Sequence, residues 1–518
     1  MPFIDFNDAR ANATFYQRNF DVTIIGCGAV GIHLALLFAE RKKSVLIIES
    51  GQVGEHPEKQ ALNESLTNRA DIKSSVQWGR KRALGGTTIR WGGQALPFQP
   101  LDFAARPWLE CDGWPIPYGD LATHYRNAER YMGVRTNGYY AEDLKELKLK
   151  SPIQSQHLEY HVSKWAPEPN MYKRHENELR TKATVLYNAH CTSIQKDAIG
   201  SCRTITVQNF KQRRCELPVN RLIIATGGVE SVRLLLANDL SHSKMLGCGF
   251  MEHPCMDLGI VTTSKPEMLQ SHFATRMIRG QKYGIRLSLT PKTQKQHELT
   301  HASASLMFET PEDAFEPLRS LQHFLRKPQF KSLLKITQSA NAFIRAGILY
   351  ARHGISWRPN AQMRLTVMCE QLASDQSKIE LDTNHLDPFG IPKMKLNWQI
   401  GAQTWNAACF IAKAAKDALE SSLPCQVELR PELSSPDLEF DQQIFSSVNH
   451  HMGGAVMGHD PQTSVVDTQL RLHDTKNIWV CSAAVFPTGS HSNPTLTALA
   501  LAGRLVEEIN HKSNAILS

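Results

Sequence analysis

The chain contains the stretch Asp21-Val22-Thr23-Ile24-Ile25-Gly26-Cys27-Gly28-Ala29-Val30-Gly31, in which a short β-branched apolar run leads into a glycine-rich turn. A helical pattern follows through Phe38 and Ala39, and a second apolar run at 45–48 ends in Glu49. Glycines let a backbone approach a pyrophosphate, a helix N-terminus attracts its negative charge, and a carboxylate after the second strand can bind a ribose hydroxyl. The stretch therefore predicts a dinucleotide site in a strand-turn-helix-strand unit. It does not distinguish NAD from FAD, and a Rossmann-like turn without nucleotide is the alternative.

Two segments near the other end of the chain combine histidines with an asparagine. The first is Asn449-His450-His451-Met452-Gly453-Gly454 and the second is Ser492-Asn493-Pro494-Thr495. A neutral imidazole can accept a proton near neutral pH, and a side-chain amide can hold a hydroxyl by hydrogen bonding, so the two suit an alcohol donor. The histidine pair alone is also compatible with a loop or a chance metal-binding pattern.

Asn493 and Pro494 are also typical of a helix start, because asparagine suits the N-cap and proline the first helical position. An apolar helical pattern continues from Thr497 to Val506. The N-terminus of this helix could stabilise negative charge developing on a bound ligand. An ordinary capped C-terminal helix is the simpler alternative.

A third glycine-rich segment, 83–93, contains Trp91 and has no standard use in a nicotinamide-binding domain. Together with the segments above, further motifs occur in a fixed order: Gly113-Trp114-Pro115-Ile116, 225–231, 250–254 and Glu370-Gln371. In these motifs the chain resembles the glucose-methanol-choline (GMC) oxidoreductases, FAD enzymes that oxidise alcohols. Within them it is most similar to the branch of pyranose oxidase and bacterial sugar and polyol dehydrogenases. The resemblance runs nearly end to end.

The resemblance implies an α/β fold with a discontinuous Rossmann-like FAD-binding domain and an inserted α+β substrate-binding domain built on an antiparallel sheet. We place the FAD-binding domain at 18–110, 180–255 and 445–518. The last piece includes a buried strand at 477–481. The substrate-binding domain takes 111–179 and 256–444.

The resemblance also implies the site. His450 would accept the proton of the substrate hydroxyl, Asn493 would orient that hydroxyl, and the carbinol hydride would pass to flavin N5. FAD would lie against the following residues: Gly26, Gly28, Gly31, Glu49, Gly85, Gly86, Thr87, Trp91, Gly92, Thr226, Gly227, Ala484, Pro494 and Thr495. His253 and the pair Glu370-Gln371 match positions near the cofactor, where we expect a structural hydrogen-bonding role.

Two positions depart from the family pattern. Some fungal sugar oxidases carry a histidine, covalently bonded to FAD, just before the matching tryptophan, whereas this chain has Arg90 before Trp91. We therefore expect noncovalent FAD. Many members also place a glycine between the first helix and the second strand, where this chain has Lys42-Lys43, so that connection should be built differently.

Composition excludes several classes. A net charge of +8 over 518 residues, without a basic run, makes nucleic acid an unexpected partner. The eleven cysteines form no CxxC pair and no metal-ligand spacing with histidine, so we expect free thiols, a reducing compartment and no metal. The first twenty residues lack an apolar signal region, and no apolar stretch is long enough to span a membrane. The sequence thus predicts a cytoplasmic protein.

The segment 317–354 holds seven Lys or Arg residues and no Asp or Glu, interleaved with apolar residues at helical spacing. We interpret it as basic amphipathic helices, either a solvated cover over the active site or a surface for anionic lipid or an anionic substrate handle.

The predicted activity is FAD-dependent oxidation of an alcohol, in first place a ring hydroxyl of a sugar or glycoside. Oxidation of a sterol or other lipid alcohol is the alternative, and a flavin-binding scaffold without turnover is a third. The electron acceptor, oxygen or another redox carrier, stays open, and so does the choice between oxidase and dehydrogenase.

Overall fold

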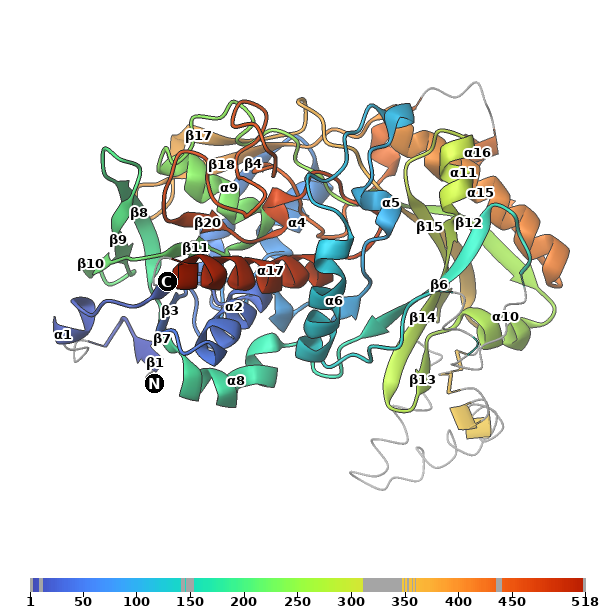
Figure 1. Cartoon of the computed structure of the whole chain (residues 1–518). Helices are drawn as coiled ribbons and strands as arrows, with labels where there is room; N and C mark the ends of the chain where they lie inside the picture. Colours follow the sequence, from blue (N-terminus) through green and yellow to red (C-terminus); the bar gives the residue numbers. More distant parts are fainter. Residues whose placement is uncertain are drawn as a thin grey trace.

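The computed structural model describes residues 3–8, 13–140, 145, 153–310, 347–348, 350–351, 354–355, 357–358, 360–434 and 440–515. Most of the basic segment 317–354 lies outside these ranges, so its predicted helices lie outside the described residues. The described chain forms two lobes, each with its own large β-sheet (Figure 1).

The first lobe is built on a six-stranded sheet in which all neighbouring strands are parallel. The strand order is β1 (Phe3–Asp5), β7 (Thr184–Tyr187), β3 (Val45–Ile48), β2 (Val22–Ile25), β11 (Leu222–Ile224) and β20 (Ile478–Val480). Every residue of β2, β3 and β11 is buried. Continuous apolar strands are typical of a parallel sheet covered on both faces, which confirms the predicted Rossmann-like fold.

Helices pack around this parallel sheet. They are α2 (Ala29–Glu40), α8 (Met171–Lys182), α9 (Gly227–Ala237) and α17 (Pro494–Ala515). α17 contacts α2 and also α6 (Gly119–Met132). In Figure 1 its C-terminal end lies over the parallel-sheet lobe, and its N-terminal end faces the second lobe. The helix begins at Pro494, directly after Asn493, as the sequence predicts.

The connection between α2 and β3 shows how this chain replaces the expected glycine. Lys42 adopts a left-handed backbone conformation with φ 59°. Its N–H donates to the carbonyl of Ala39 (2.9 Å), and that of Lys43 donates to the carbonyl of Phe38 (3.1 Å). The helix therefore ends in a left-handed turn that usually favours glycine, here built with a lysine.

The second lobe is built on an antiparallel sheet, as predicted. Its order is β19 (Cys425–Leu429), β12 (Cys255–Thr263), β16 (Gln362–Cys369), β15 (Ala302–Glu309), β14 (Gln281–Leu289), β6 (Leu158–Trp165) and β5 (Gln94–Ala95), and β13 (Arg276–Ile278) pairs with β14. The long helix α15 (Ala402–Ser422) contacts β14, β15, β16 and β19.

Two three-stranded sheets complete the described strands: β10 (Arg214–Pro218), β9 (Cys202–Gln208) and β8 (His190–Lys196), and then β17 (Lys378–Leu386), β18 (Pro392–Asn397) and β4 (Ser65–Thr67). The remaining described helices are α1 (Ala13–Tyr16), α3 (Pro57–Gln60), α4 (Ala70–Trp78), α5 (Pro100–Phe103), α10 (Pro266–Phe273), α11 (Pro291–Gln296) and α16 (Pro431–Ser434). Short 3-10 helices span Ala61–Asn63, Gly86–Ile89, Pro107–Leu109, Gln442–Ile444 and Ala483–Val485. The division into 18–110, 180–255 and 445–518 against 111–179 and 256–444 stays a prediction.

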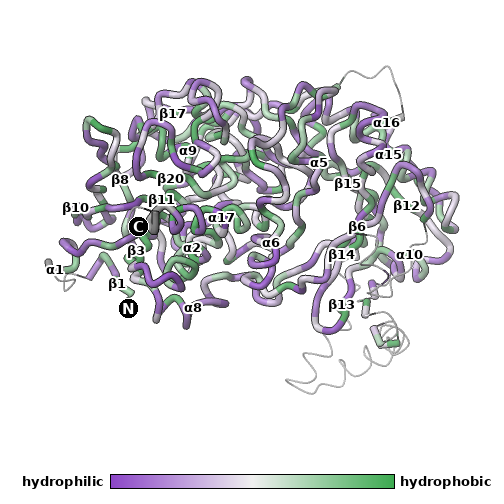
Figure 2. Tube along the Cα trace, in the orientation of Figure 1, coloured by the Kyte–Doolittle hydropathy of each residue, from purple (hydrophilic) through white to green (hydrophobic). Residues whose placement is uncertain are grey.

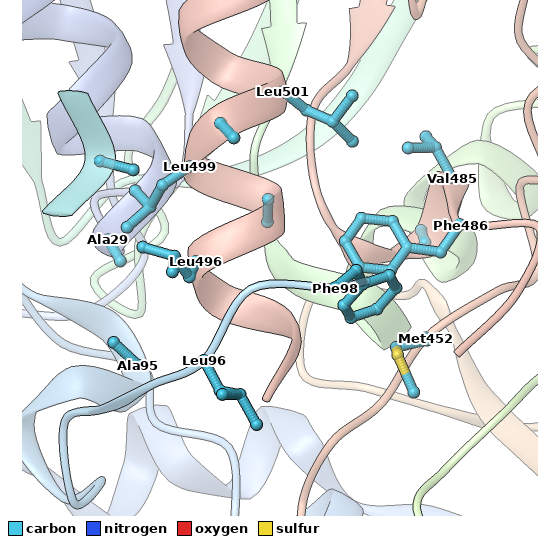
Figure 3. Close-up of a cluster of buried hydrophobic side chains, with 14 of the residues drawn as sticks. Ala29, Ala95, Leu96, Phe98, Met452, Val485, Phe486, Leu496, Leu499 and Leu501 are labelled. Carbon is cyan, nitrogen blue, oxygen red and sulfur yellow. The ribbon is translucent and has the colours of Figure 1, made fainter. Parts of the chain in front are cut away.

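The apolar interior reaches the segments that carry the predicted catalytic residues. Hydrophobic residues lie along β11, β20 and α2 inside the first lobe (Figure 2). In Figure 3 the rings of Phe98 and Phe486 lie against each other, with centroids 5.5 Å apart and planes at 80°, beside Met452. Leu496, on the first turn of α17, belongs to the same buried cluster. Because Met452 follows His450 by two residues and Leu496 follows Asn493 by three, this core anchors both segments.

Candidate active site

A cavity of about 820 Å³ runs from the glycine turn after β2 to His450 and Asn493. Gly26, Glu49 and Ala225 line it, and each follows directly on a strand of the parallel sheet. The carboxyl edge of such a sheet is where doubly wound folds bind ligands.

The turn after β2 needs glycines because other backbone atoms lie too close to leave room for a Cβ. Gly26 has φ +105°, and a Cβ on Gly31 would lie 1.9 Å from the carbonyl oxygen of Gly26. A Cβ on Gly86 would lie 2.9 Å from the Cα of Gly28, so two bare backbones meet at the cavity. The N-cap residue Gly28 offers α2 no side-chain hydrogen bond. The free N–H groups of this helix end fit a phosphate.

Glu49 is buried and lines the same end of the cavity. Its carboxylate accepts hydrogen bonds from the backbone N–H of Cys27 (2.9 Å) and Gly51 (2.8 Å). Burial raises the pKa of this carboxyl, while those two hydrogen bonds and Arg82 lower it. A carboxylate at the end of the second strand fits a ribose hydroxyl.

Most of the residues predicted to contact a cofactor do line the cavity. The lining includes Gly26, Gly28, Glu49, Gly86, Thr87, Trp91, Gly92, Thr226, Gly227, Pro494 and Thr495, together with His450 and Asn493. Gly31, Gly85 and Ala484 do not line it. Gly85 instead donates its N–H to the carbonyl of Cys27 (2.8 Å), and Ala484 accepts from the N–H of Ala455 (2.9 Å). Gly85 and Ala484 thus make backbone hydrogen bonds next to the residues that line the cavity.

An arginine cluster around Glu230 was not predicted from the sequence. Glu230 lies 2.8 Å from Arg82, 3.3 Å from Arg80 and 3.1 Å from Arg233. Burial alone would raise the pKa of Glu230, but the three guanidinium groups hold it well below its usual range. Arg80, Arg82 and Glu230 line the cavity. A basic tripeptide immediately before the segment 83–93 was the available sequence signal.

His190 is a second residue that the sequence analysis missed. It is buried, lines the cavity, and stacks on Phe389 with ring centroids 4.8 Å apart. Its Nε2 atom has no hydrogen-bond partner in the described part of the chain. Burial lowers the pKa of this imidazole to about 3, so a neutral ring faces the cavity. Such an orphaned polar atom fits the polar edge of a bound nucleotide.

The opposite end of the cavity brings together His450 and Asn493. Nδ2 of Asn493 lies 3.0 Å from Nε2 of His450. Nδ1 of His450 lies 2.9 Å from Nδ1 of His253. Burial, together with the neighbouring His253 and Arg286, holds the pKa of His450 well below its usual range. The ring is therefore neutral at neutral pH and can accept a proton.

His451, the neighbour in the histidine pair, makes different contacts. Its Nε2 lies 2.8 Å from Oγ of Ser75 and 3.6 Å from the carboxylate of Glu252. Burial lowers its pKa to about 3. Of the two histidines, His450 is the one that contacts Asn493.

Glu370 and Gln371 make the hydrogen bonds expected of structural residues. Both carboxylate oxygens of Glu370 lie 2.6 Å from the guanidinium of Arg106, and neither side chain is exposed. Oε1 of Gln371 accepts from the indole N–H of Trp398 (2.7 Å) and from the backbone N–H of Glu252 (3.2 Å). These bonds connect the second lobe to the segment that carries His253.

Arg90 and Trp91 lie where the cavity meets the antiparallel sheet. Arg90 forms an ion pair with Glu55, and its side chain is 68% exposed. The indole N–H of Trp91 donates to the carbonyl of Pro169 (2.6 Å). Three residues of the second lobe's sheet line the cavity beyond them: Gln94, Trp165 and Met368.

A family model described as GMC oxidoreductase matches residues 373–502, the range that contains both His450 and Asn493. This C-terminal part of the chain is a GMC oxidoreductase domain. The match supports an enzyme of the flavoprotein class that acts on CH–OH donors.

Curated relatives include two bacterial dehydrogenases. The fructose dehydrogenase large subunit of Gluconobacter japonicus is 22% identical over 94% of this chain and 97% of the relative. The gluconate 2-dehydrogenase flavoprotein of Pantoea cypripedii is 29% identical over 24% of this chain and 20% of its own. The 6'''-hydroxyparomomycin C oxidase of Streptomyces lividus is 29% identical over 23% of this chain and 24% of its own.

Solved structures show the same fold. Pyridoxine 4-oxidase from Mesorbium loti superposes with a TM-score of 0.54 and 13% identity, over 95% of the present chain and 99% of its own. A formate oxidase gives a TM-score of 0.54 and 15% identity, over 96% and 99%. None of the helices in the described part of the chain has the length and apolar character needed to span a bilayer. All eleven cysteines are free thiols, as predicted.

Proposed function

We propose that this GMC oxidoreductase oxidises a ring hydroxyl of a sugar or glycoside, with His450 as the base and Asn493 as the residue that orients the hydroxyl. The observation that carries the proposal is the 3.0 Å contact between Nδ2 of Asn493 and Nε2 of His450 at the end of the cavity. Relatives named for fructose and gluconate support a sugar-type substrate.

FAD would be held along the cavity by the glycine turn after β2, by Glu49 and by the segment 85–92. The N-terminus of α17, at Pro494 and Thr495, would face the flavin end. When bound, FAD supplies the hydride acceptor at its N5 atom. Arg90 precedes Trp91 and is engaged by Glu55, and arginine offers no imidazole nitrogen for a covalent bond. We therefore propose that FAD binds noncovalently.

The two polar side chains would divide the work on the alcohol. His450 would take the hydroxyl proton at Nε2, since burial keeps its ring neutral. Asn493 would donate a hydrogen bond from Nδ2 to the substrate oxygen, and its Oδ1 is buried without a partner among the described residues. Donors already in place where charge develops require no reorganisation during the reaction.

The lining beyond the histidine fits a polar ring. Gln94 donates to Oγ of Ser163 (2.7 Å), so its side chain is fixed, and Trp165 offers an aromatic surface beside it. An amide and an aromatic face suit the alternating hydroxyls and C–H faces of a sugar. The segment 317–354, which would serve a lipid-alcohol substrate, lies mostly outside the described residues.

The test is anaerobic flavin bleaching by a panel of sugars, glycosides and sterols. We expect one or more sugars to bleach the flavin bands, and His450→Ala to slow bleaching by about 10²- to 10⁴-fold, the usual contribution of a positioned base. His459→Ala, at an exposed position, is the matched control. Bleaching by sterols alone would contradict the substrate class, and unchanged bleaching in His450→Ala would contradict the catalytic assignment. Admitting air then distinguishes an oxidase from a dehydrogenase.

We further propose that the protein works in a reducing compartment such as the cytoplasm. The support is that the eleven cysteines are all unpaired and that burial raises the pKa of ten of them: Cys27, Cys191, Cys202, Cys215, Cys248, Cys255, Cys369, Cys409, Cys425 and Cys481. Thiols protonated in this way persist without disulfides.

A further inference from the structure

Four groups form a continuous hydrogen-bonded series that begins at the cavity wall, where Asn493 and His450 lie. Nδ2 of Asn493 lies 3.0 Å from Nε2 of His450, and Nδ1 of His450 lies 2.9 Å from Nδ1 of His253. Nε2 of His253 then lies 3.0 Å from the carbonyl oxygen of Gly489. His253 is fully buried, so water does not compete for either of its ring nitrogens.

The last member of this chain sets the direction of every hydrogen bond. A carbonyl oxygen can only accept, so Nε2 of His253 must carry the proton. Burial lowers the pKa of His253 to about 4, so the ring is neutral and its Nδ1 has a lone pair. Nδ1 of His450 must then donate to it. Because a neutral imidazole has one N–H, Nε2 of His450 is left with the lone pair, which accepts from Asn493.

We propose that His253 is a positioning residue that holds His450 in the tautomer with its lone pair on Nε2, facing the cavity. The inference rests on the proposed role of His450 as the base. With the other tautomer, Nε2 would carry a proton and have no capacity to take one from the substrate hydroxyl.

Neighbouring residues fix both ends of the chain. Oε1 of Glu252 accepts from the backbone N–H of His253 (2.8 Å) and of His450 (2.7 Å), so one carboxylate connects the two histidine backbones. Near Gly489, Oγ of Ser490 donates to the carboxylate of Asp102 (2.7 Å). The Glu252 contacts hold the backbone of His253, and the Ser490 contact holds the segment next to Gly489. The Gly489 carbonyl therefore keeps its position facing His253.

Burial and the nearby charged groups together lower the pKa of both imidazole rings. Burial is the largest influence on His253, with Glu370 acting to raise its pKa and Arg286 to lower it. Arg286 and His451 also act to lower the pKa of His450. Both imidazole rings are therefore neutral, and each carries a single N–H proton.

The first experiment reads the tautomer directly. Protein labelled with ¹⁵N-histidine is examined by two-bond ¹H–¹⁵N correlation NMR, and His450 is assigned from the signals lost in His450→Ala. We expect protonated Nδ1 and unprotonated Nε2 in the parent protein, and loss of this preference in His253→Leu. His253→Asn, whose Oδ1 can replace the accepting nitrogen, should restore it. A protonated Nε2 in the parent, or an unchanged tautomer in His253→Leu, would overturn the proposal.

The second experiment asks whether His253 acts through His450. Anaerobic flavin reduction is followed at saturating D-fructose and D-gluconate in single and double variants. We expect His253→Leu to lower the rate at least about tenfold with little change in KM, and by no more than the about 10²- to 10⁴-fold that a positioned base contributes. In a His450→Ala background it should cause no further loss. An equal loss in both backgrounds would indicate a merely structural role.

The two proposals fail separately. If His450→Ala reduces flavin at the parent rate, the proposed function is wrong, whereas the NMR result still decides the tautomer. Retained flavin absorbance and thermal midpoint in His253→Leu show that the variant is folded. If that variant does not fold, the parent spectrum and His253→Asn decide the question.

Discussion

The amide nitrogen of Asn493 lies 3.0 Å from Nε2 of His450, although 43 residues separate them in the chain. Both sit on rigid supports. Met452 and Leu496 are part of the buried apolar cluster, and Asn493 directly precedes the 22-residue helix α17. A pair held by a packed core and a long helix keeps its geometry without a bound ligand.

Asn493→Asp should abolish the base. An acceptor-only carboxylate next to Nε2 favours the protonated ring and raises the pKa of His450, so the lone pair is lost at neutral pH. We expect flavin reduction to slow by about 10²-fold or more. Anaerobic stopped-flow spectroscopy measures this rate.

Asn493→His is the matched comparison, since some family members resembling this chain carry histidine there. This variant can still donate a hydrogen bond and should retain more activity than the aspartate variant. Equal rates in both variants would argue against a donor role for residue 493.

Glu370→Gln should destabilise the fold strongly. It leaves the fully buried Arg106 without its bidentate carboxylate, and an uncompensated buried charge costs about 3–5 kcal/mol. Urea unfolding measured by tryptophan fluorescence checks the free energy of unfolding. Glu380→Gln is the control. Oε2 of Glu380 lies 3.8 Å from Nζ of Lys395, and the two side chains are 55% and 58% exposed. This ion pair should contribute about 0.5 kcal/mol or less to the free energy of unfolding. Equal effects of the two substitutions would contradict the interpretation.

Gly31→Ala should weaken both the fold and FAD retention. Its Cβ would lie 1.9 Å from the carbonyl oxygen of Gly26, so the turn after β2 has to move. We expect a loss of about 1–3 kcal/mol in the free energy of unfolding and less flavin per purified chain. Gly119→Ala has no atom within 4 Å of the added Cβ and should be neutral or stabilising. A flavin-replete, stable Gly31→Ala protein would show that the turn tolerates a side chain.

All of the FAD should leave the protein on acid precipitation. Arg90, which precedes Trp91, pairs with Glu55 and offers no imidazole nitrogen for a covalent flavin bond. Absorbance of the supernatant and mass spectrometry of the precipitated chain measure the two fractions. A precipitate that stays yellow, with a chain mass increased by FAD, would contradict noncovalent binding.

Acid should destabilise the protein, in part through His33. Burial, with smaller effects of His175 and His124, lowers the pKa of His33 from 6.5 to about 3. The unfolded chain therefore binds a proton that the folded chain excludes, so the stability is fully present above pH 6.5 and is lost as pH falls toward 3. At pH 5 the loss from this one residue should be about 2 kcal/mol.

The measurement is urea unfolding at pH 7 and pH 5 for the parent and His33→Phe. The difference between the two pH values should shrink in the variant, because phenylalanine does not titrate. His242→Gln, at an exposed position, should leave the difference unchanged. A variant as acid-sensitive as the parent would show that other buried groups dominate.

Local pattern was enough to predict the elements around the dinucleotide turn. A β-branched run, glycines and a second apolar run predicted β2, α2 and β3, and Asn493-Pro494 predicted the start of α17. These features depend on backbone preferences and on periodicity, which neighbouring residues set among themselves. The same reasoning could not place the arginine cluster around Glu230, since Arg80 and Glu230 are 150 residues apart.

The sequence by itself thus determined the fold class, the resemblance to a family and the residue types available for catalysis. Only the tertiary structure decided which atoms of those residues meet. Nδ1 of His450 contacts Nδ1 of His253 across 197 residues, and the carbonyl of Gly489 lies on the far side of His253. The direction of a proton along such a chain depends on ring orientation and on a fixed acceptor, and these come into existence only when three distant segments are packed together.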